Sequence, residues 1–172
     1  EFRRVLFRSR KGANGTHHHH REKVGGEIMV QELYFEDVNV GDAVPSVEKA
    51  PVSKDQIWRY AGASGDFNAL HMDDEWGTMA GMGGRIAHGM LLMGFAGQAV
   101  TNYVPKKYLK KFDVRFGGMT KLDDVITISG SIKDKRTENG ENIITGELLA
   151  TDQNGDMKVT GTFEAALPSK SA

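Results

Sequence analysis

The chain has 172 residues, of which 39% are hydrophobic and 26% charged, and its formal net charge is -1. These values are typical of one domain with an apolar core, and they give no indication of a nucleic-acid partner. The absence of cysteine excludes disulfide bonds, thiolate zinc sites and a cysteine nucleophile. Because no run approaches eighteen apolar residues, we predict no membrane span. The absence of cysteine is compatible with a reducing cytosol, and we expect a cytoplasmic protein.

The first part of the chain differs in character from the rest. Residues 1–30 carry seven Lys or Arg against three Asp or Glu, and four consecutive histidines occupy positions 17–20. The apolar core and small-residue cleavage site of a secretory signal peptide are both missing from this segment. We therefore expect residues 1–28 to be a tag or non-native leader without order, and residues 29–172 to form a single domain.

The domain is predicted to begin with a strand and a short helix. Residues 44–52 alternate weakly, and the two prolines among them place this strand at the edge of a sheet. Ser53 followed by Gln56 has the spacing of a capping box. The apolar residues within 57–61 then predict a short helix, which Gly62 is expected to end.

The next segment concentrates groups suited to catalysis. Ser64-Gly65-Asp66-Phe67-Asn68-Ala69-Leu70-His71 places a carboxylate, an amide and an imidazole within six residues. Asp66 and His71 are five residues apart, which is about 140° around an ideal helix, so a loop is needed to bring the two side chains together. A carboxylate and an imidazole that meet in this way are suited to general acid/base catalysis.

A glycine-rich stretch and a long apolar run follow. Residues 72–85 are predicted to be irregular, and residues 86–100 are hydrophobic nearly all round, which predicts a central buried helix. Each of the three glycines in the run lowers helix stability by roughly 1 kcal/mol relative to alanine. Their presence indicates that the helix lies close to another backbone, or that one of its amides must be approached. Gly89, at the start of the run, can present a backbone N–H to an oxyanion.

The C-terminal half has the periodicity of strands. After Pro105 the apolar residues alternate with a period of two. Asn-Gly pairs at 139–140 and 154–155 separate alternating runs, which predicts hairpins. We expect an antiparallel meander, and for the whole chain an α+β fold in which a sheet curls round one apolar helix, with strands near residues 112–116, 125–132, 141–151 and 157–167.

The motif residues resemble a known family. Tyr60, the segment 64–71 and the run Ala87-His88-Gly89-Met90-Leu91 are similar to those of the MaoC-like (R)-specific enoyl-thioester hydratases and dehydratases. The likeness extends over residues 33–166 and is strongest to single-domain members such as the mycobacterial-type 3-hydroxyacyl-ACP dehydratase subunit. It implies the hot-dog fold, and assembly as a homodimer or as a heterodimer with a related subunit.

The resemblance also assigns roles to residues. Asp66 and His71 become the catalytic pair that adds water to a trans-2-enoyl thioester of CoA or ACP, forming an (R)-3-hydroxyacyl thioester, or removes it. The Gly89 N–H becomes the oxyanion donor. Supporting or substrate-binding positions are Ser64, Gly65, Asn68 and His88. The reaction needs no cofactor, and two histidines seventeen residues apart, without further ligands nearby in sequence, predict no metal site.

Two other functions stay open at this point. A hot-dog thioesterase carries its carboxylate on the central helix, whereas residues 86–100 contain no Asp or Glu. A non-catalytic partner subunit or acyl-binding module lacks the catalytic pair, whereas this chain has both residues. The chain departs from the family pattern at Ala69, where proline is usual, and at 121–124, where Lys-Leu-Asp-Asp replaces a Pro-Gly-Asp turn. Neither departure removes a reacting group.

Overall fold

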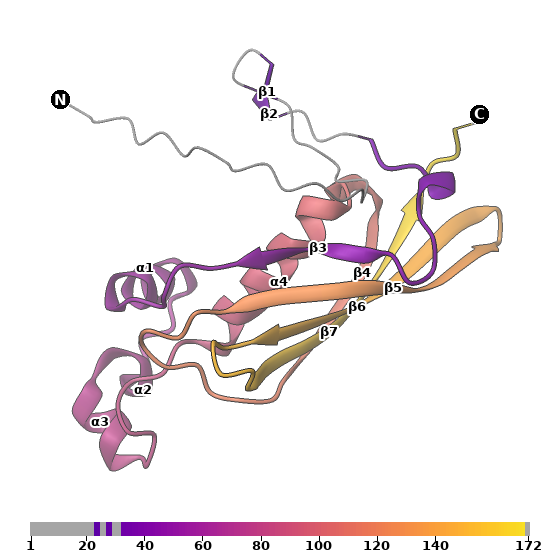
Figure 1. Ribbon diagram of the computed structural model, residues 1–172. Coiled ribbons are helices and arrows are strands. Elements are labelled where there is room, and N and C mark those ends of the chain that lie inside the picture. The colour runs from indigo at the N-terminus through magenta and orange to yellow at the C-terminus, as the bar shows by residue number, and fades with distance from the viewer. Residues whose placement is uncertain (1–22, 25–26, 29–31, 171–172) are drawn as a thin grey trace, which may run out of the picture. The chain divides into compact units, whose positions relative to one another are not determined.

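The computed structural model describes residues 23–24, 27–28 and 32–170 (Figure 1). The chain divides into two units, residues 1–31 and 32–172. In the first unit, β1 (Lys23–Val24) pairs with β2 (Glu27–Ile28) in antiparallel orientation. The disorder expected for the remainder of residues 1–28 falls outside the described residues. Within the described ranges, no helix is both long and apolar enough to cross a membrane.

The second unit is built on a five-stranded antiparallel sheet with the order β3-β5-β6-β7-β4. Its strands are β3 (Ala43–Glu48), β4 (Leu109–Phe116), β5 (Thr127–Glu138), β6 (Glu141–Thr151) and β7 (Met157–Leu167). The edge position predicted for β3 is confirmed, and β5, β6 and β7 form a meander. The expectation that the meander includes β4 is wrong, because β4 pairs with β7 at the far edge of the sheet.

The hairpin between β5 and β6 turns where the Asn-Gly signal predicts it. Asn139 and Gly140 have φ angles of 51° and 80°, and Glu138 pairs with Glu141 across the turn. Two successive positive φ angles are the requirement of a type I′ turn, which asparagine and glycine meet at the lowest steric cost.

Helix α4 (Gly89–Tyr103) packs against the sheet (Figure 1). Its buried residues recur in adjacent pairs every four positions, which forms one apolar stripe: Leu91, Leu92, Phe95, Ala96, Ala99 and Val100. The stripe joins a single core with inward residues of the strands such as Ile128, Ile144 and Phe163. This burial supplies most of the driving force that holds helix and sheet together.

The opposite side of α4 is open in this chain. Met90, Gly94 and Gln98 are exposed, so the predicted central helix is buried on the side that faces the sheet and not on this one. A Cβ at Gly94 would meet no atom within 4 Å. The helix also starts at Gly89 rather than at residue 86, because residues 86–88 remain extended and pair with the loop that follows β4.

Short helices cluster at one end of the unit. They are α1 (Lys54–Ser64), α2 (Ala69–Met72) and α3 (Asp74–Met79), with the 3-10 turns η1 (Phe35–Asp37) and η2 (Lys106–Tyr108) elsewhere. The predicted cap of α1 is confirmed, because the Ser53 hydroxyl accepts the Gln56 N–H at 3.1 Å. The predicted end at Gly62 is wrong: α1 continues to Ser64, and Gly65, with φ of 74°, terminates it in the left-handed conformation.

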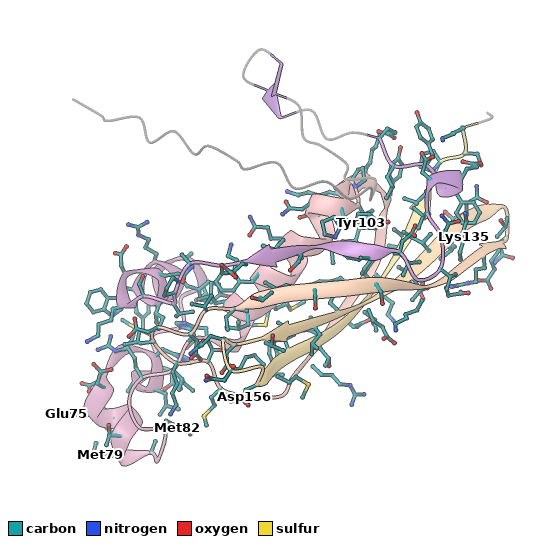
Figure 2. All side chains as sticks on the ribbon, viewed as in Figure 1. Glu75, Met79, Met82, Tyr103, Lys135 and Asp156 are labelled. Atoms are coloured by element: carbon teal, nitrogen blue, oxygen red, sulfur yellow. The ribbon has the colours of Figure 1, made fainter. Side chains whose placement is uncertain are left out.

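The glycine-rich segment 72–85 is more ordered than predicted, because α3 lies within it. Asp73 caps α3 by accepting the Glu75 and Trp76 amides. A salt bridge of 2.7 Å between Arg85 Nε and Asp74 Oδ1 joins the end of the segment to the start of α3. The hydrogen bonds from Arg85 and then from Lys54 hold the pKa of Asp74 well below its ordinary value. Figure 2 shows Met79 and Met82 at the tip of this excursion.

Two helical glycines are expected to respond in opposite ways to substitution by alanine. A Cβ at Gly77 in α3 would lie 2.1 Å from the Gly84 carbonyl oxygen, whereas a Cβ at Gly62 in α1 would meet nothing within 4 Å. We expect Gly77→Ala to lower the free energy of unfolding by about 1–3 kcal/mol through overpacking. The matched change Gly62→Ala should raise it by about 0.5–1 kcal/mol. Urea unfolding measures both, and equal effects would contradict the packing seen at Gly77.

Candidate active site

The loop after α1 is fixed by hydrogen bonds of its own side chains. The Ser64 hydroxyl donates to the Tyr60 carbonyl at 2.8 Å and accepts the Asp66 N–H at 3.3 Å. One oxygen of Asp66 accepts the Asn68 N–H, and Asn68 in turn caps α2 by accepting the Leu70 N–H. Ser64, Gly65 and Asn68 therefore build the loop that carries Asp66, and they lie outside the lining of the neighbouring cavity.

His71 enters the site from α2 and has a defined orientation. Its Nδ1 lies 2.8 Å from the Ile86 carbonyl oxygen. Because a carbonyl can only accept, Nδ1 carries a hydrogen and Nε2 is the nitrogen that faces the site. The backbone supports this arrangement, since the Ile86 N–H donates to the Leu70 carbonyl.

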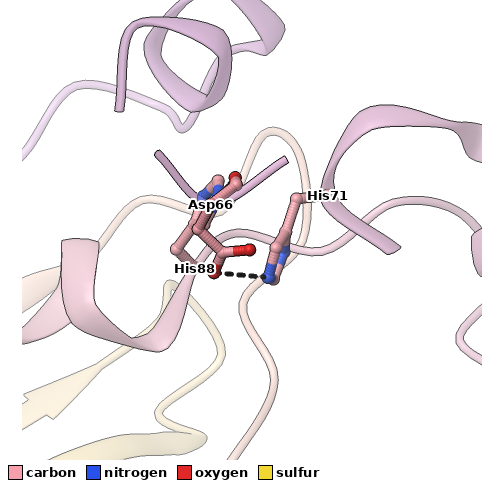
Figure 3. Close-up of side chains that lie close together, drawn as sticks. All are labelled: Asp66, His71 and His88. Carbon is pink, nitrogen blue, oxygen red and sulfur yellow. Dashed lines mark hydrogen bonds and ion pairs between the residues drawn. The ribbon is translucent and has the colours of Figure 1, made fainter. Parts of the chain in front are cut away.

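Asp66 and His71 meet across the loop (Figure 3). The distance from Asp66 Oδ2 to His71 Nε2 is 3.9 Å, with the aspartate side chain 54% exposed and the histidine side chain 14% exposed. The two atoms are too far apart for a good direct hydrogen bond and close enough for one water molecule to bond to both. Asp66 thus offers a solvated carboxylate and His71 a largely buried imidazole around one position.

His88 lies directly beside this pair. Its Nε2 is 2.9 Å from the backbone carbonyl oxygen of Asp66. Its ring stacks on that of His71, with centroids 3.8 Å apart and an interplanar angle of 27°. Tyr60 covers the ring at a centroid distance of 4.9 Å. Only 2% of His88 is exposed.

Gly89 begins α4 next to His88, and its backbone N–H has no acceptor within the helix. A Cβ at this position would lie 3.3 Å from Phe116, so a larger residue would press on that ring. Gly89 and His71 line one cavity of about 430 Å³, together with Ile86, Ala87, Leu92, Phe116, Gly117, Gly118, Met119, Thr120, Lys158 and Val159. Asp66 stands outside this lining, on the solvent side of His71.

The cavity wall contains a buried ionic cluster that the sequence did not reveal. Lys158 Nζ lies 2.9 Å from Asp152 Oδ2, 3.8 Å from Asp124 Oδ2 and 3.0 Å from the Met119 carbonyl oxygen. Burial lowers the pKa of Lys158, but the Asp152 hydrogen bond and the nearby carboxylates outweigh it and raise the pKa overall. The hydrogen bond from Lys158 lowers the pKa of Asp152. No local spacing in the sequence indicates this cluster.

The structure brings three possible metal ligands together, which their spacing in the sequence does not indicate. Ligand atoms of Asp66, His71 and His88 lie within 4.8 Å of one another. Imidazole nitrogens bind an ion in the plane of the ring, and the two rings are stacked face to face, so their lone pairs do not converge. One nitrogen of each ring also faces a backbone carbonyl.

Residues 37–153 match the family model of the MaoC like domain. The chain belongs to the MaoC-like family. It is 29% identical over 130 residues to an (R)-specific enoyl-CoA hydratase from Rhodospirillum rubrum, a match that covers 66% of this chain and 88% of the relative.

Solved structures share the fold. The (R)-hydratase from A. caviae superposes with a TM-score of 0.69 at 24% identity, covering 77% of this chain and 99% of that one. The ChsH1–ChsH2 complex from Mycobacterium tuberculosis gives a TM-score of 0.65 at 22% identity, with 75% and 98% covered. The predicted α+β hot-dog fold of the MaoC-like family is therefore confirmed.

Proposed function

We propose that this protein catalyses the reversible hydration of trans-2-enoyl thioesters to (R)-3-hydroxyacyl thioesters. The observation that carries the proposal is the 3.9 Å separation of Asp66 Oδ2 and His71 Nε2, beside a cavity that His71 shares with Gly89. The (R) configuration and the CoA thioester are taken from the name of the Rhodospirillum rubrum relative. A thioester of an acyl carrier protein presents the same reacting atoms.

The pair divides the proton transfers of the reaction. The Asp66 carboxylate accepts a proton from the bound water as the water oxygen forms its bond to C3. His71, protonated on both nitrogens, gives the proton on Nε2 to C2, and the C2=C3 double bond becomes single. A proton then passes from Asp66 to His71 through the next water, which restores both groups. Such positioned acid/base groups contribute typically about 10²–10⁴-fold each.

Gly89 is proposed to stabilise the charge that develops on the thioester oxygen. As C3 is attacked, electron density moves to this oxygen and an enolate forms. The N–H of Gly89 has no acceptor within α4, and the partial positive charge of a helix N-terminus favours an anion there. A Cβ at this position would lie 3.3 Å from Phe116, which lines the same cavity, so glycine fits there without displacing that ring.

Assembly as a dimer is part of the proposal. The exposed side of α4, with Met90 and Gly94, supports a partner surface on this helix. The ChsH1–ChsH2 structure is a complex of two different chains, so a related subunit is the alternative to a second copy. A non-catalytic role within such a complex is the second candidate function. The presence of both Asp66 and His71 favours catalysis by this chain.

The test is a direct assay of the purified full chain. Crotonyl-CoA, a longer enoyl-CoA and the crotonyl thioester of an acyl carrier protein are followed by loss of the ultraviolet band of the conjugated thioester. Chiral chromatography identifies the product, and light scattering determines the oligomeric state of the same sample. Because the chain has no cysteine, a thiol reagent reports only thiol released by thioester hydrolysis.

The outcomes separate the candidate functions. Loss of the band with an (R)-3-hydroxyacyl product and no free thiol is the expected result. Thiol release without hydration would identify a thioesterase. A folded sample that leaves all three thioesters unchanged would contradict the proposed activity and favour the non-catalytic subunit.

A further inference from the structure

Histidine is an unusual residue for the position that His88 occupies at the start of α4. It is the residue that precedes the first turn of α4, yet its side chain makes no capping hydrogen bond to that helix. Serine, threonine, aspartate and asparagine are the residues that cap helices well. The imidazole instead turns away from α4 toward the loop of Asp66, with which it forms its hydrogen bond.

The protonation of the ring follows from its partners. The Asp66 carbonyl can only accept, so Nε2 of His88 carries a hydrogen. Nδ1 is buried and has no hydrogen-bond partner among the described residues. The groups that face His88 are Asp66, His71 and Tyr60, and His88 offers them one N–H donor and a flat ring.

We propose that His88 is a positioning residue that holds both members of the acid/base pair to the N-terminus of α4. Its Nε2–H fixes the backbone of Asp66, its ring fixes the plane of His71, and its own backbone continues directly into Gly89. One side chain thereby contacts the loop of the carboxylate and the ring of the imidazole, next to the proposed oxyanion donor. This inference rests on the hydration activity proposed above.

Two variants separate the functions of the side chain. His88→Gln keeps an N–H donor near the position of Nε2 and removes the ring. His88→Phe keeps a ring against His71 and removes the donor to Asp66. Tyr60→Phe keeps the ring on the other side of His88 and serves as the matched control. The kcat and KM of each are measured with the enoyl thioester that the wild type hydrates best, after circular dichroism and thermal unfolding have established folding.

We expect a loss in kcat with little change in KM, because substrate contacts in the cavity stay in place while the reacting groups shift. A misplacement on the scale of 1 Å costs about 10²-fold, so His88→Phe should lose about 100-fold in kcat. His88→Gln should recover about tenfold of that loss by restoring the bond to Asp66. The KM should stay within about threefold of wild type, since only transition-state interactions are weakened. Tyr60→Phe should match the wild type.

Three results would overturn the inference. One is a kcat within twofold of wild type in a folded His88→Phe or His88→Gln. A second is a rise in KM that accounts for the whole loss. A third is a His88→Gln that is no better than His88→Phe. If His88→Phe fails to fold, His88→Gln alone decides, with a tenfold loss in kcat at unchanged KM as the supporting result. An inactive wild type would instead refute the hydration activity itself.

Discussion

Asp66→Asn is expected to lower the kcat for hydration of an enoyl thioester by about 10²–10⁴-fold, the contribution typical of a positioned acid or base. An amide has almost the shape of the carboxylate but cannot take a proton from water. Its oxygen can still accept the Asn68 N–H that shapes the loop. The loss should therefore appear in kcat, with unfolding behaviour close to that of the wild type. The ultraviolet assay and a thermal melt measure the two effects.

His71→Asn tests the other half of the pair under the same logic. The amide nitrogen of asparagine stands near the position of Nδ1 and can donate to the Ile86 carbonyl, while the group at Nε2 is removed. Asp55→Asn is the matched control, because this carboxylate lies on the surface of α1 in an ion pair with Arg59. Retention of more than a tenth of the activity in Asp66→Asn or His71→Asn would refute the assigned pair.

Lys158→Met is expected to lower the free energy of unfolding by about 3–5 kcal/mol, the cost typical of breaking a buried ion pair from one side. The side chain of Lys158 is 10% exposed and that of Asp152 is 3% exposed. Methionine fills a similar volume but leaves the carboxylates of Asp152 and Asp124 without their cation, and the Met119 carbonyl without its donor. Urea unfolding followed by tryptophan fluorescence measures the difference.

The loss in free energy of unfolding caused by Lys158→Met should depend on pH in a defined direction. The folded-state pKa of Asp152 is lowered, so its pairing stabilises the wild type above the pKa of an unfolded aspartate, about 3.9. That contribution is lost as the pH falls through the lower folded-state pKa. The difference between wild type and Lys158→Met should thus be full at neutral pH and shrink in acid.

Lys133→Met is the matched control for this prediction. Lys133 pairs with Glu147 at 3.3 Å, but both side chains are more than half exposed. Such a surface pair contributes about 0–1 kcal/mol. Equal effects of the two lysine changes on the free energy of unfolding would show that the buried ionic cluster in the cavity wall does not stabilise the domain.

The proposed role of His88 explains how the site combines residues from two distant segments. Asp66 and His71 come from the loop and short helix after α1, whereas His88 and Gly89 come from the start of α4. A hydrogen bond and a ring stack, both made by His88, join the two segments. Ile86 reinforces the junction, because its carbonyl accepts a hydrogen bond from the His71 side chain and its N–H donates to the Leu70 carbonyl.

Local features of this protein could be predicted from the sequence because their interactions lie within a few residues. Ser53 caps α1 through an amide three positions away, and the turn at Asn139 and Gly140 depends on the φ preferences of those two residues. The catalytic hypothesis arose in the same way, since Asp66, Asn68 and His71 are close in the chain. The apolar run predicted a helix, although its first residue was placed three positions early.

Other features were decided only by the tertiary structure. Helix α3 lies in a glycine-rich segment, where Arg85 binds Asp74 from the far side of the loop. The position of β4 beside β7 depends on a strand that occurs about fifty residues later. Contacts between groups so far apart are determined by which surfaces pack together, and local propensity carries no information about them. The stacking of His88 on His71 and the burial of Lys158 between two aspartates are of this kind.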